Sequence, residues 1–164
     1  MHYSMLRFVY LNGNNYILNK DTILYRIIYV NEYNLNNFYM SKNNIICFPS
    51  FSSSSFTKNF QTTNNAKKVN NISENDIKIK MKLIYNHNSN NVPIGMILKE
   101  FSIAQHENEV LLFPFTFIKV NYLIKINKKY YKLKGTIINK DQVLEFGLKA
   151  GKKVILKNSI LTLE

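Results

Sequence analysis

Short apolar runs, rich in β-branched and aromatic residues, alternate with polar, asparagine-rich stretches along the chain. The densest run is Thr22–Val30, and it predicts a strand that is buried on both faces. In Asp76–Tyr85 apolar positions alternate with lysines, which predicts a strand with one buried and one solvent-facing side. Further strands are expected at Ile45–Phe51, Ile94–Phe101, Glu109–Ile118 and Val154–Leu163, and a hairpin or paired strands over Tyr122–Asn139.

Helices are expected to be few and short. Asn31–Asn37 and Val143–Lys149 are the candidates, while Thr57–Asp76 is polar and predicts either loop alone or loop with one helix. A strand-dominated chain with little helix indicates an all-β or α+β body of two packed layers.

Length and composition fit one globular domain. The chain has 164 residues, of which 46% are apolar, enough for a buried core. No apolar run approaches the roughly 18 residues of a membrane-spanning helix, and the first residues lack the apolar core of a signal peptide. A single cysteine, Cys47, excludes an intrachain disulfide. We therefore expect no membrane span and slightly favour a cytoplasmic location.

The chain is strongly basic, with 22 Lys and Arg residues against 10 Asp and Glu residues. Only Arg7 and Arg26 are arginines, the residue type best suited to bidentate phosphate or carboxylate recognition. The excess has two interpretations, a solvated surface in a Lys-, Asn- and Ile-rich sequence or a face for an anionic partner. Because aromatic residues and arginines do not interleave with the lysines as in common nucleic-acid modules, we expect no specific nucleic-acid binding. Any such affinity should be weak, sequence-blind and salt-sensitive.

Two of the scarce acids, Glu107 and Glu109, stand one residue apart at the start of an expected strand. On a strand they would share one face, with Cα atoms about 6.6 Å apart. Paired carboxylates repel, so one interpretation is a solvated strand entrance. The other is a pair that flanks a reacting glycosidic carbon, because this spacing leaves room for a nucleophile.

A serine run and an arginine are two further candidates. Ser50–Ser55 is interrupted only by Phe51 and directly follows an apolar strand. It is either a flexible linker or a strand end whose hydroxyls bind a carboxylate or a sugar. Arg26 lies among apolar neighbours, so it is either at a solvent edge or is buried and needs a carboxylate or a bound phosphate.

The order of these three features resembles the arginine–serine–glutamate branch of the ADP-ribosyltransferases, and within it the arginine-specific mono-ADP-ribosyltransferase family. Leu24–Arg26 matches the family's aromatic–arginine element. Ser50–Ser55 looks like its Ser-Phe-x-Ser-Thr-Ser element, with Ser54 in the threonine place. Glu107–Leu111, followed by Phe113 and Pro114, is similar to its Glu-x-Glu-Val-Leu-x-Phe-Pro block, the most specific of the three. The resemblance covers about residues 20–120, and the basic tail 121–164 resembles the segment that comes after this domain in some members.

The resemblance implies an α+β fold of two packed strand-rich sheets that forms one catalytic domain over residues 1–164. It implies that Arg26 contacts a phosphate or ribose oxygen of NAD+ and that Ser53 holds the catalytic glutamate. Glu109 would be that glutamate, stabilising the oxocarbenium-like transition state. Glu107 would orient the acceptor guanidinium and accept its proton.

Three further expectations come from the same resemblance. Ile27 stands where the family usually has glycine, and we expect its backbone to line the NAD+ site. Phe60 or Phe56 would stack on nicotinamide. The helical lobe that precedes the arginine strand in the family is expected to be reduced or missing, since 25 residues precede Arg26.

Two classes of function therefore stay open. The first is an enzyme: a monomeric transferase that uses NAD+ as co-substrate, needs no metal and modifies an exposed arginine of a protein, with NAD glycohydrolase side activity. The second is a catalytically silent domain of the same fold, or a basic β-rich module that binds anionic partners. Convergence of Arg26, Ser53 and Glu109 on one cleft would favour the enzyme.

Overall fold

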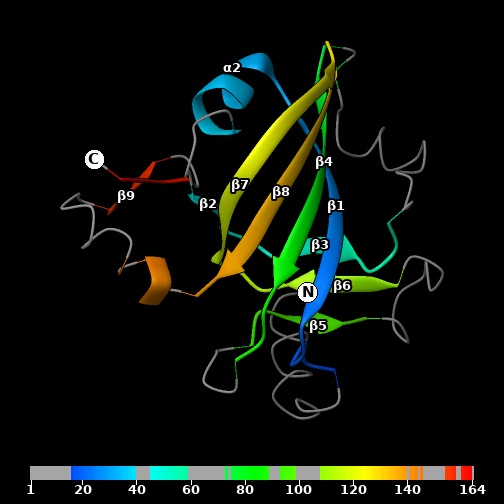
Figure 1. Cartoon of the computed structure of the whole chain (residues 1–164), viewed down its shortest axis with the longest axis vertical. Helices are drawn as coiled ribbons and strands as arrows, with labels where there is room; N and C mark the ends of the chain where they lie inside the picture. Colours follow the sequence, from blue (N-terminus) through cyan, green and yellow to red (C-terminus); the bar gives the residue numbers. More distant parts are fainter. Residues whose placement is uncertain are drawn as a thin grey trace.

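Strands make up nearly all the regular structure of the described residues (Figure 1). The computed structural model describes residues 16–39, 45–58, 73, 75–88, 93–98, 108–139, 141–143, 145, 154–157 and 160–163. Its strands are β1 (Thr22–Val30), β2 (Ile45–Phe48), β3 (Ser52–Ser55), β4 (Ile77–Tyr85), β5 (Gly95–Ile97), β6 (Glu109–Leu112), β7 (Thr116–Asn127), β8 (Tyr130–Ile138), β9 (Val154–Lys157) and β10 (Ile160–Leu163). The strand-rich α+β expectation is confirmed. The expected N-terminal lobe concerns mainly residues before 16, which lie outside the described residues.

A short helix comes after β1 where the sequence predicts one. The helix α2 (Glu32–Asn34) continues into a π-helical turn, η1 (Leu35–Tyr39). The side chain of Asn31 caps it by accepting a hydrogen bond of 2.8 Å from the backbone N–H of Asn34. An asparagine at this position satisfies one of the donors that every helix start leaves unpaired. In the described structure, no helix is long and apolar enough to cross a membrane.

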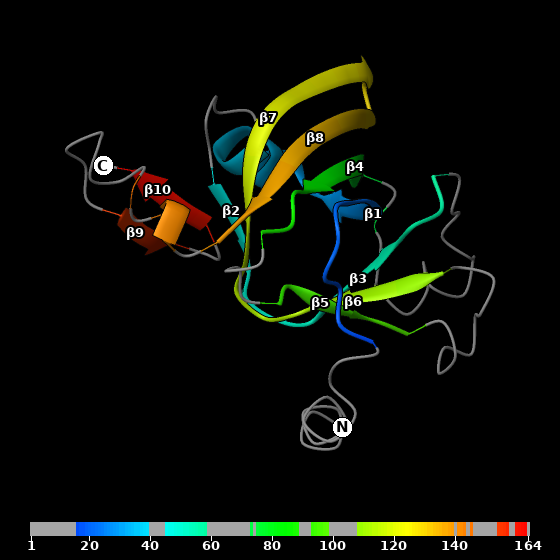
Figure 2. The ribbon, with the colours of Figure 1, turned by 60° about the horizontal axis from the view of Figure 1, so that its bottom comes forward.

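The strands adopt one hydrogen-bonded order, β5-β6-β3-β1-β4-β8-β7-β2-β10-β9. Figure 2 shows that this sheet folds over, with β5, β6 and β3 in a layer beneath β1, β4, β8 and β7. Within the described strands, the ladder joining the two layers pairs Tyr25 of β1 with Ser55 of β3. The two packed layers are therefore continuous through a narrow junction.

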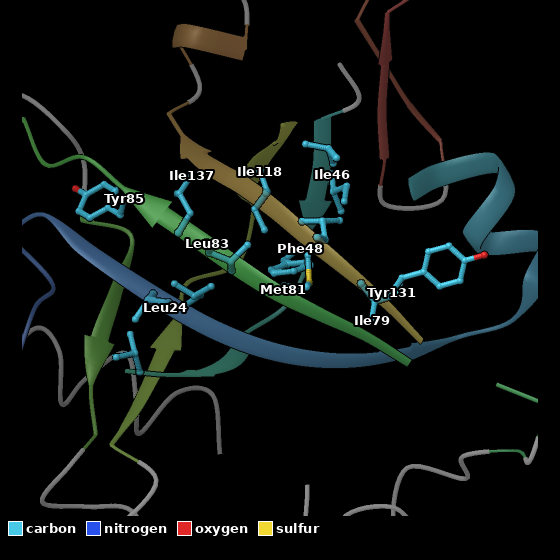
Figure 3. Close-up of a cluster of buried hydrophobic side chains, with 14 of the residues drawn as sticks. Leu24, Ile46, Phe48, Ile79, Met81, Leu83, Tyr85, Ile118, Tyr131 and Ile137 are labelled. Carbon is cyan, nitrogen blue, oxygen red and sulfur yellow. The ribbon is translucent and has the colours of Figure 1, made fainter. Parts of the chain in front are cut away.

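The main core fills the space between these layers. Figure 3 shows side chains of β1, β2, β4, β7 and β8 that belong to it. Its most deeply buried members come from both layers: Leu24, Ile79, Met81, Leu83, Val110, Leu112 and Ile118. The alternation predicted for β4 is confirmed, because Ile79, Met81 and Leu83 are buried while Lys82 is exposed. Burial of these apolar side chains is the main source of stability for such a sheet.

Three expected strands are divided differently in the structure. Ile45–Phe51 ends at Phe48, because Pro49 has no N–H to donate, and Ser52–Ser55 forms its own strand. Glu109–Ile118 breaks into β6 and β7 at a turn in which Phe115 has a φ of 60°. Val154–Leu163 forms the two strands β9 and β10, which pair with each other.

The remaining expectations are confirmed in part. Tyr122–Asn139 does lie in a hairpin of β7 and β8, but β1 is mostly half-buried rather than buried on both faces. The described part of Ile94–Phe101 contains β5, and residues 141–143 and 145 are helical near the expected Val143–Lys149. The rest of both ranges lies outside the described residues.

The buried face of β4 gives a stability prediction. Leu83→Ala should lower the free energy of unfolding by about 2–5 kcal/mol, because it removes apolar contacts and leaves a cavity. Lys82→Ala, next to it on the exposed face, should not lower it by more than about 0.5 kcal/mol. Urea denaturation of both variants checks this, and equal losses would contradict the assigned strand faces.

Candidate active site

Arg26 connects the two layers through its side chain. It lies at the centre of β1 and shares a face with Leu24, since side chains alternate along a strand. Its Nη1 donates a hydrogen bond to the backbone carbonyl of Ser53 on β3. Its guanidinium carbon also lies 5.2 Å from the centroid of the Phe48 ring, a cation–π arrangement. The partners seen among the described residues are thus a carbonyl and a ring, where the sequence predicted a carboxylate or a phosphate.

Within the described structure, the groups around the Arg26 guanidinium only partly compensate for the loss of water around its charge. Burial lowers its pKa, and interaction with the Tyr39 phenol partly opposes this effect. Burial also disfavours the charged form of Tyr39, and for a phenol this raises the pKa. The Nε of Arg26 is buried and has no hydrogen-bond partner among the described residues. A buried donor on a cation is costly unless an acceptor reaches it, so an anionic oxygen at this point would be favourable.

The serines of β3 divide between the two faces of their strand. Ser53 is exposed and lies opposite Leu111 of β6, whereas Ser55 is buried and lies opposite Glu109. Ser52 and Ser54 point to the other face, opposite Leu112 and Val110 of the core. The Oγ of Ser54 is buried and has no partner in the described part of the chain. The run is therefore a structured strand and not a flexible linker.

Glu109 is the first residue of β6, and its backbone is held from both sides. It pairs with Ser55 of β3, and its carbonyl accepts a hydrogen bond of 2.9 Å from the N–H of Leu98 beyond β5. Its side chain is half-buried. Ser53, two residues from Ser55 on the same face, is its diagonal neighbour across the strands. The backbone of Glu109 is therefore paired with a strand segment on each side.

Asn108 ends the strand alternation just before Glu109. It adopts a φ of 47°, in the left-handed region that asparagine tolerates better than most residues. Its carbonyl accepts from the N–H of Phe56 at 3.3 Å, and its Nδ2 lies 3.4 Å from the Oγ1 of Thr57. In the described structure β6 begins at Glu109, and Glu107 lies outside the described residues, so the expectation that the two glutamates share one strand face stays a prediction.

Of the other predicted site residues, the structure describes Ile27 and Phe56. Ile27 lies opposite Lys80 and points away from the Arg26 side of β1. Phe56 packs against the main core. Glu107 and Phe60 lie outside the described residues, and their roles stay predictions.

Arg26, Ser53 and Glu109 thus belong to three neighbouring strands, β1, β3 and β6. The hydrogen bond from Arg26 to the Ser53 carbonyl and the β3–β6 ladder join these three strands. Two hollows of the described structure are lined by other residues, and a cleft shared by Arg26, Ser53 and Glu109 stays a prediction.

Three contributors to this region were not predicted from the sequence. Ser55 belongs to the recognised serine run, but its place opposite Glu109 depends on the strand register. Asn108 stands inside the recognised Glu-x-Glu element, and the affinity of asparagine for left-handed turns is the signal that could have found it. No local pattern indicates that Phe48, which comes from β2, contacts Arg26.

Comparisons with known proteins give matches among solved structures. No protein-family model matches the chain, and no curated protein sequence matches it. The Vis toxin, an ADP-ribosyltransferase from Vibrio splendidus, superposes with a TM-score of 0.58 at 16% identity, over 98% of this chain and 65% of the toxin chain. The Salmonella SpvB ATR domain gives 0.55 at 14% identity, over 84% of this chain and 74% of that one. The ADP-ribosyltransferase HopU1 of Pseudomonas syringae gives 0.53 at 15% identity, over 74% and 47%.

This chain therefore spans less than two thirds of the Vis toxin chain, and the sequence identities are low. The superposition on Vis covers nearly the whole of this chain, and at such low identity it shows that the two backbones follow a similar path. The chain has the fold of the ADP-ribosyltransferases.

Proposed function

We propose that the protein is an NAD+-dependent mono-ADP-ribosyltransferase that transfers ADP-ribose to an arginine side chain of a protein and releases nicotinamide. The observation that carries the proposal is the position of Glu109 on β6, paired with the serine strand β3, to which Arg26 donates a hydrogen bond. A fold alone does not define a reaction, so the proposal rests on these side chains.

Glu109 supplies the charge that nicotinamide release requires. As the bond between ribose and nicotinamide breaks, positive charge develops on the ribose carbon, and a fixed carboxylate nearby stabilises it. Nicotinamide leaves as a neutral molecule, so no general acid is needed. The hydroxyl of Ser53 holds the carboxylate in place from the neighbouring strand.

Arg26 binds the anionic part of NAD+. Its buried Nε, which has no partner in the described structure, is a donor available to a phosphate or ribose oxygen. The burial that lowers the pKa of Arg26 would be compensated by the negative charge of a bound diphosphate. Its bond to Ser53 couples NAD+ binding to the strand beside Glu109. The backbone of Ile27 and the ring of Phe60 are proposed to complete the NAD+ site.

An arginine acceptor is supported by a ligand of a structural neighbour. Vis has been crystallised in complex with agmatine, a molecule that carries the same guanidinium group as an arginine side chain. A guanidinium is protonated in water and must lose a proton as it attacks. We assign that role to Glu107. With water in place of the guanidinium, the same site would hydrolyse NAD+.

The two glutamates give a division of labour that mutation can separate. Glu109→Gln keeps shape but removes charge, so release of nicotinamide should fall about 100–1000-fold, together with transfer. Glu107→Gln should lose transfer to agmatine but keep hydrolysis of NAD+, because water needs no carboxylate to seat it. Nicotinamide release and label transfer from NAD+ to agmatine are measured side by side.

A matched control for this pair is Glu145→Gln, an exposed acid far along the sequence, which should leave both activities unchanged. Equal loss of both activities in the Glu107 and Glu109 variants would refute the division of labour. An inactive parent chain would favour the alternative, a catalytically silent domain of this fold.

Asn108 gives a prediction about positioning. Asn108→Ala should lower nicotinamide release about tenfold, because alanine resists the left-handed φ that places Glu109. Asn108→Gly should stay closer to the parent activity, since glycine adopts this φ without strain. An equal loss with glycine and with alanine would mean that the Asn108 side chain, and not the backbone turn, is what matters.

A further inference from the structure

A ladder of lysines occupies the sheet face turned away from the main core. Figure 1 shows β7, β8, β4 and β1 side by side, and their residue pairing sets out the rows that cross this face. One row runs Tyr25, Lys82, Lys134, Tyr122 from β1 to β7. The next runs Ile27, Lys80, Lys132, Ile124. Two lysines thus stand together at the centre of each row, with an aromatic or apolar side chain on either side.

This arrangement is unfavourable for the sheet itself. Like charges directly opposite on neighbouring strands destabilise a sheet, and here two such pairs are stacked. Burial, together with the ammonium groups of Lys78, Lys58 and Lys132, lowers the pKa of Lys80. Like charges clustered against the preference of the strand pairing are typical of a site for an oppositely charged ligand.

The same face is hollowed. A cavity of about 350 Å³ is lined by five lysines and three tyrosines. They are the four lysines of the two rows (Lys80, Lys82, Lys132 and Lys134), Lys58, Tyr25, Tyr122 and Tyr130. None of its lining residues, all of which belong to the described part of the chain, is acidic. Tyr122 is 48% exposed, and the ammonium of Lys134 lies 5.7 Å from its ring centroid.

We propose that this hollow, the lysine–tyrosine groove, binds single-stranded nucleic acid without sequence preference. The central lysines match a phosphate backbone in charge, and the flanking tyrosines offer faces on which bases stack. A concave surface fits an extended chain better than a flat membrane, and an acidic peptide would not use the rings. The sequence expectation that aromatic residues do not interleave with the lysines fails here because pairing across strands brings Tyr25 and Tyr122 to them. The proposal does not rest on the transferase activity.

The test is binding of a fluorescent 20-nucleotide oligothymidylate, measured by anisotropy between 50 and 200 mM NaCl without NAD+. Four phosphate contacts on a single strand predict a slope of log K against log salt of about −3, from roughly −0.7 per contact. Lys82→Gln with Lys134→Gln should bring this slope to about −1.4. Tyr122→Leu should weaken binding about tenfold and leave the slope unchanged.

The matched control is Lys20→Gln with Lys125→Gln, which removes the same charge from exposed positions outside the groove. It should leave the slope unchanged. The Lys82 and Lys134 double variant should melt no lower than the parent, because it relieves repulsion between opposed lysines. A lower melting temperature would show that these lysines stabilise the sheet and would overturn the proposal.

Four other outcomes would also overturn it. The first two are no binding of the oligonucleotide at 50 mM NaCl and a control variant that lowers the slope as much as the Lys82 and Lys134 double variant does. The third is poly-L-glutamate binding as tightly as the oligonucleotide, with no effect of Tyr122→Leu, and the fourth is displacement of the oligonucleotide by NAD+. The last would make the groove part of the NAD+ site.

Discussion

The hydrogen bond from the Arg26 guanidinium to the Ser53 carbonyl is the contact on which the candidate site depends. The two layers of the sheet are joined by a narrow ladder at Tyr25 and Ser55, and Arg26 adds a charged donor beside it. A charge-assisted hydrogen bond in a partly desolvated place is stronger than a neutral one. It holds β3 against β1, and β3 in turn sets the position of β6 and of Glu109.

The two faces of the upper layer, formed by β1, β4, β8 and β7, carry different side chains. The side turned inward buries a continuous apolar cluster that stabilises the fold. The side turned outward carries opposed lysines that oppose folding locally, although the same strands supply both. Apolar side chains and lysines alternate along β4 up to Leu83, so its lysines occupy no position on the buried face. The lysine–tyrosine groove therefore does not weaken the apolar cluster on the other face of the strand. Glu109, Ser55 and Tyr25 lie in line with Lys82 across the strand order, so the candidate site and the groove are parts of one sheet.

Local sequence patterns predicted much of the fold but not its pairings. The strand Thr22–Val30 was predictable from its β-branched and aromatic residues, although its burial was not. The buried face of β4 was predictable because its apolar positions alternate with lysines. The separate strand Ser52–Ser55 was not, since four serines have low β-propensity and are held there by pairing with β6. Arg26, Ser53 and Glu109 were predictable as candidates from their motifs. The left-handed Asn108, the Phe48 ring beside Arg26 and the rows of paired lysines depend on contacts between distant segments, which no local pattern reports.

The most direct test of the proposed NAD+ site is a crystal structure of the Glu109→Gln variant with NAD+, in which the dinucleotide should remain uncleaved. We predict a phosphate or ribose oxygen within hydrogen-bonding distance of the Arg26 Nε, and the nicotinamide ribose beside residue 109. NAD+ bound elsewhere, with the Arg26 Nε still lacking a partner, would contradict the proposed site.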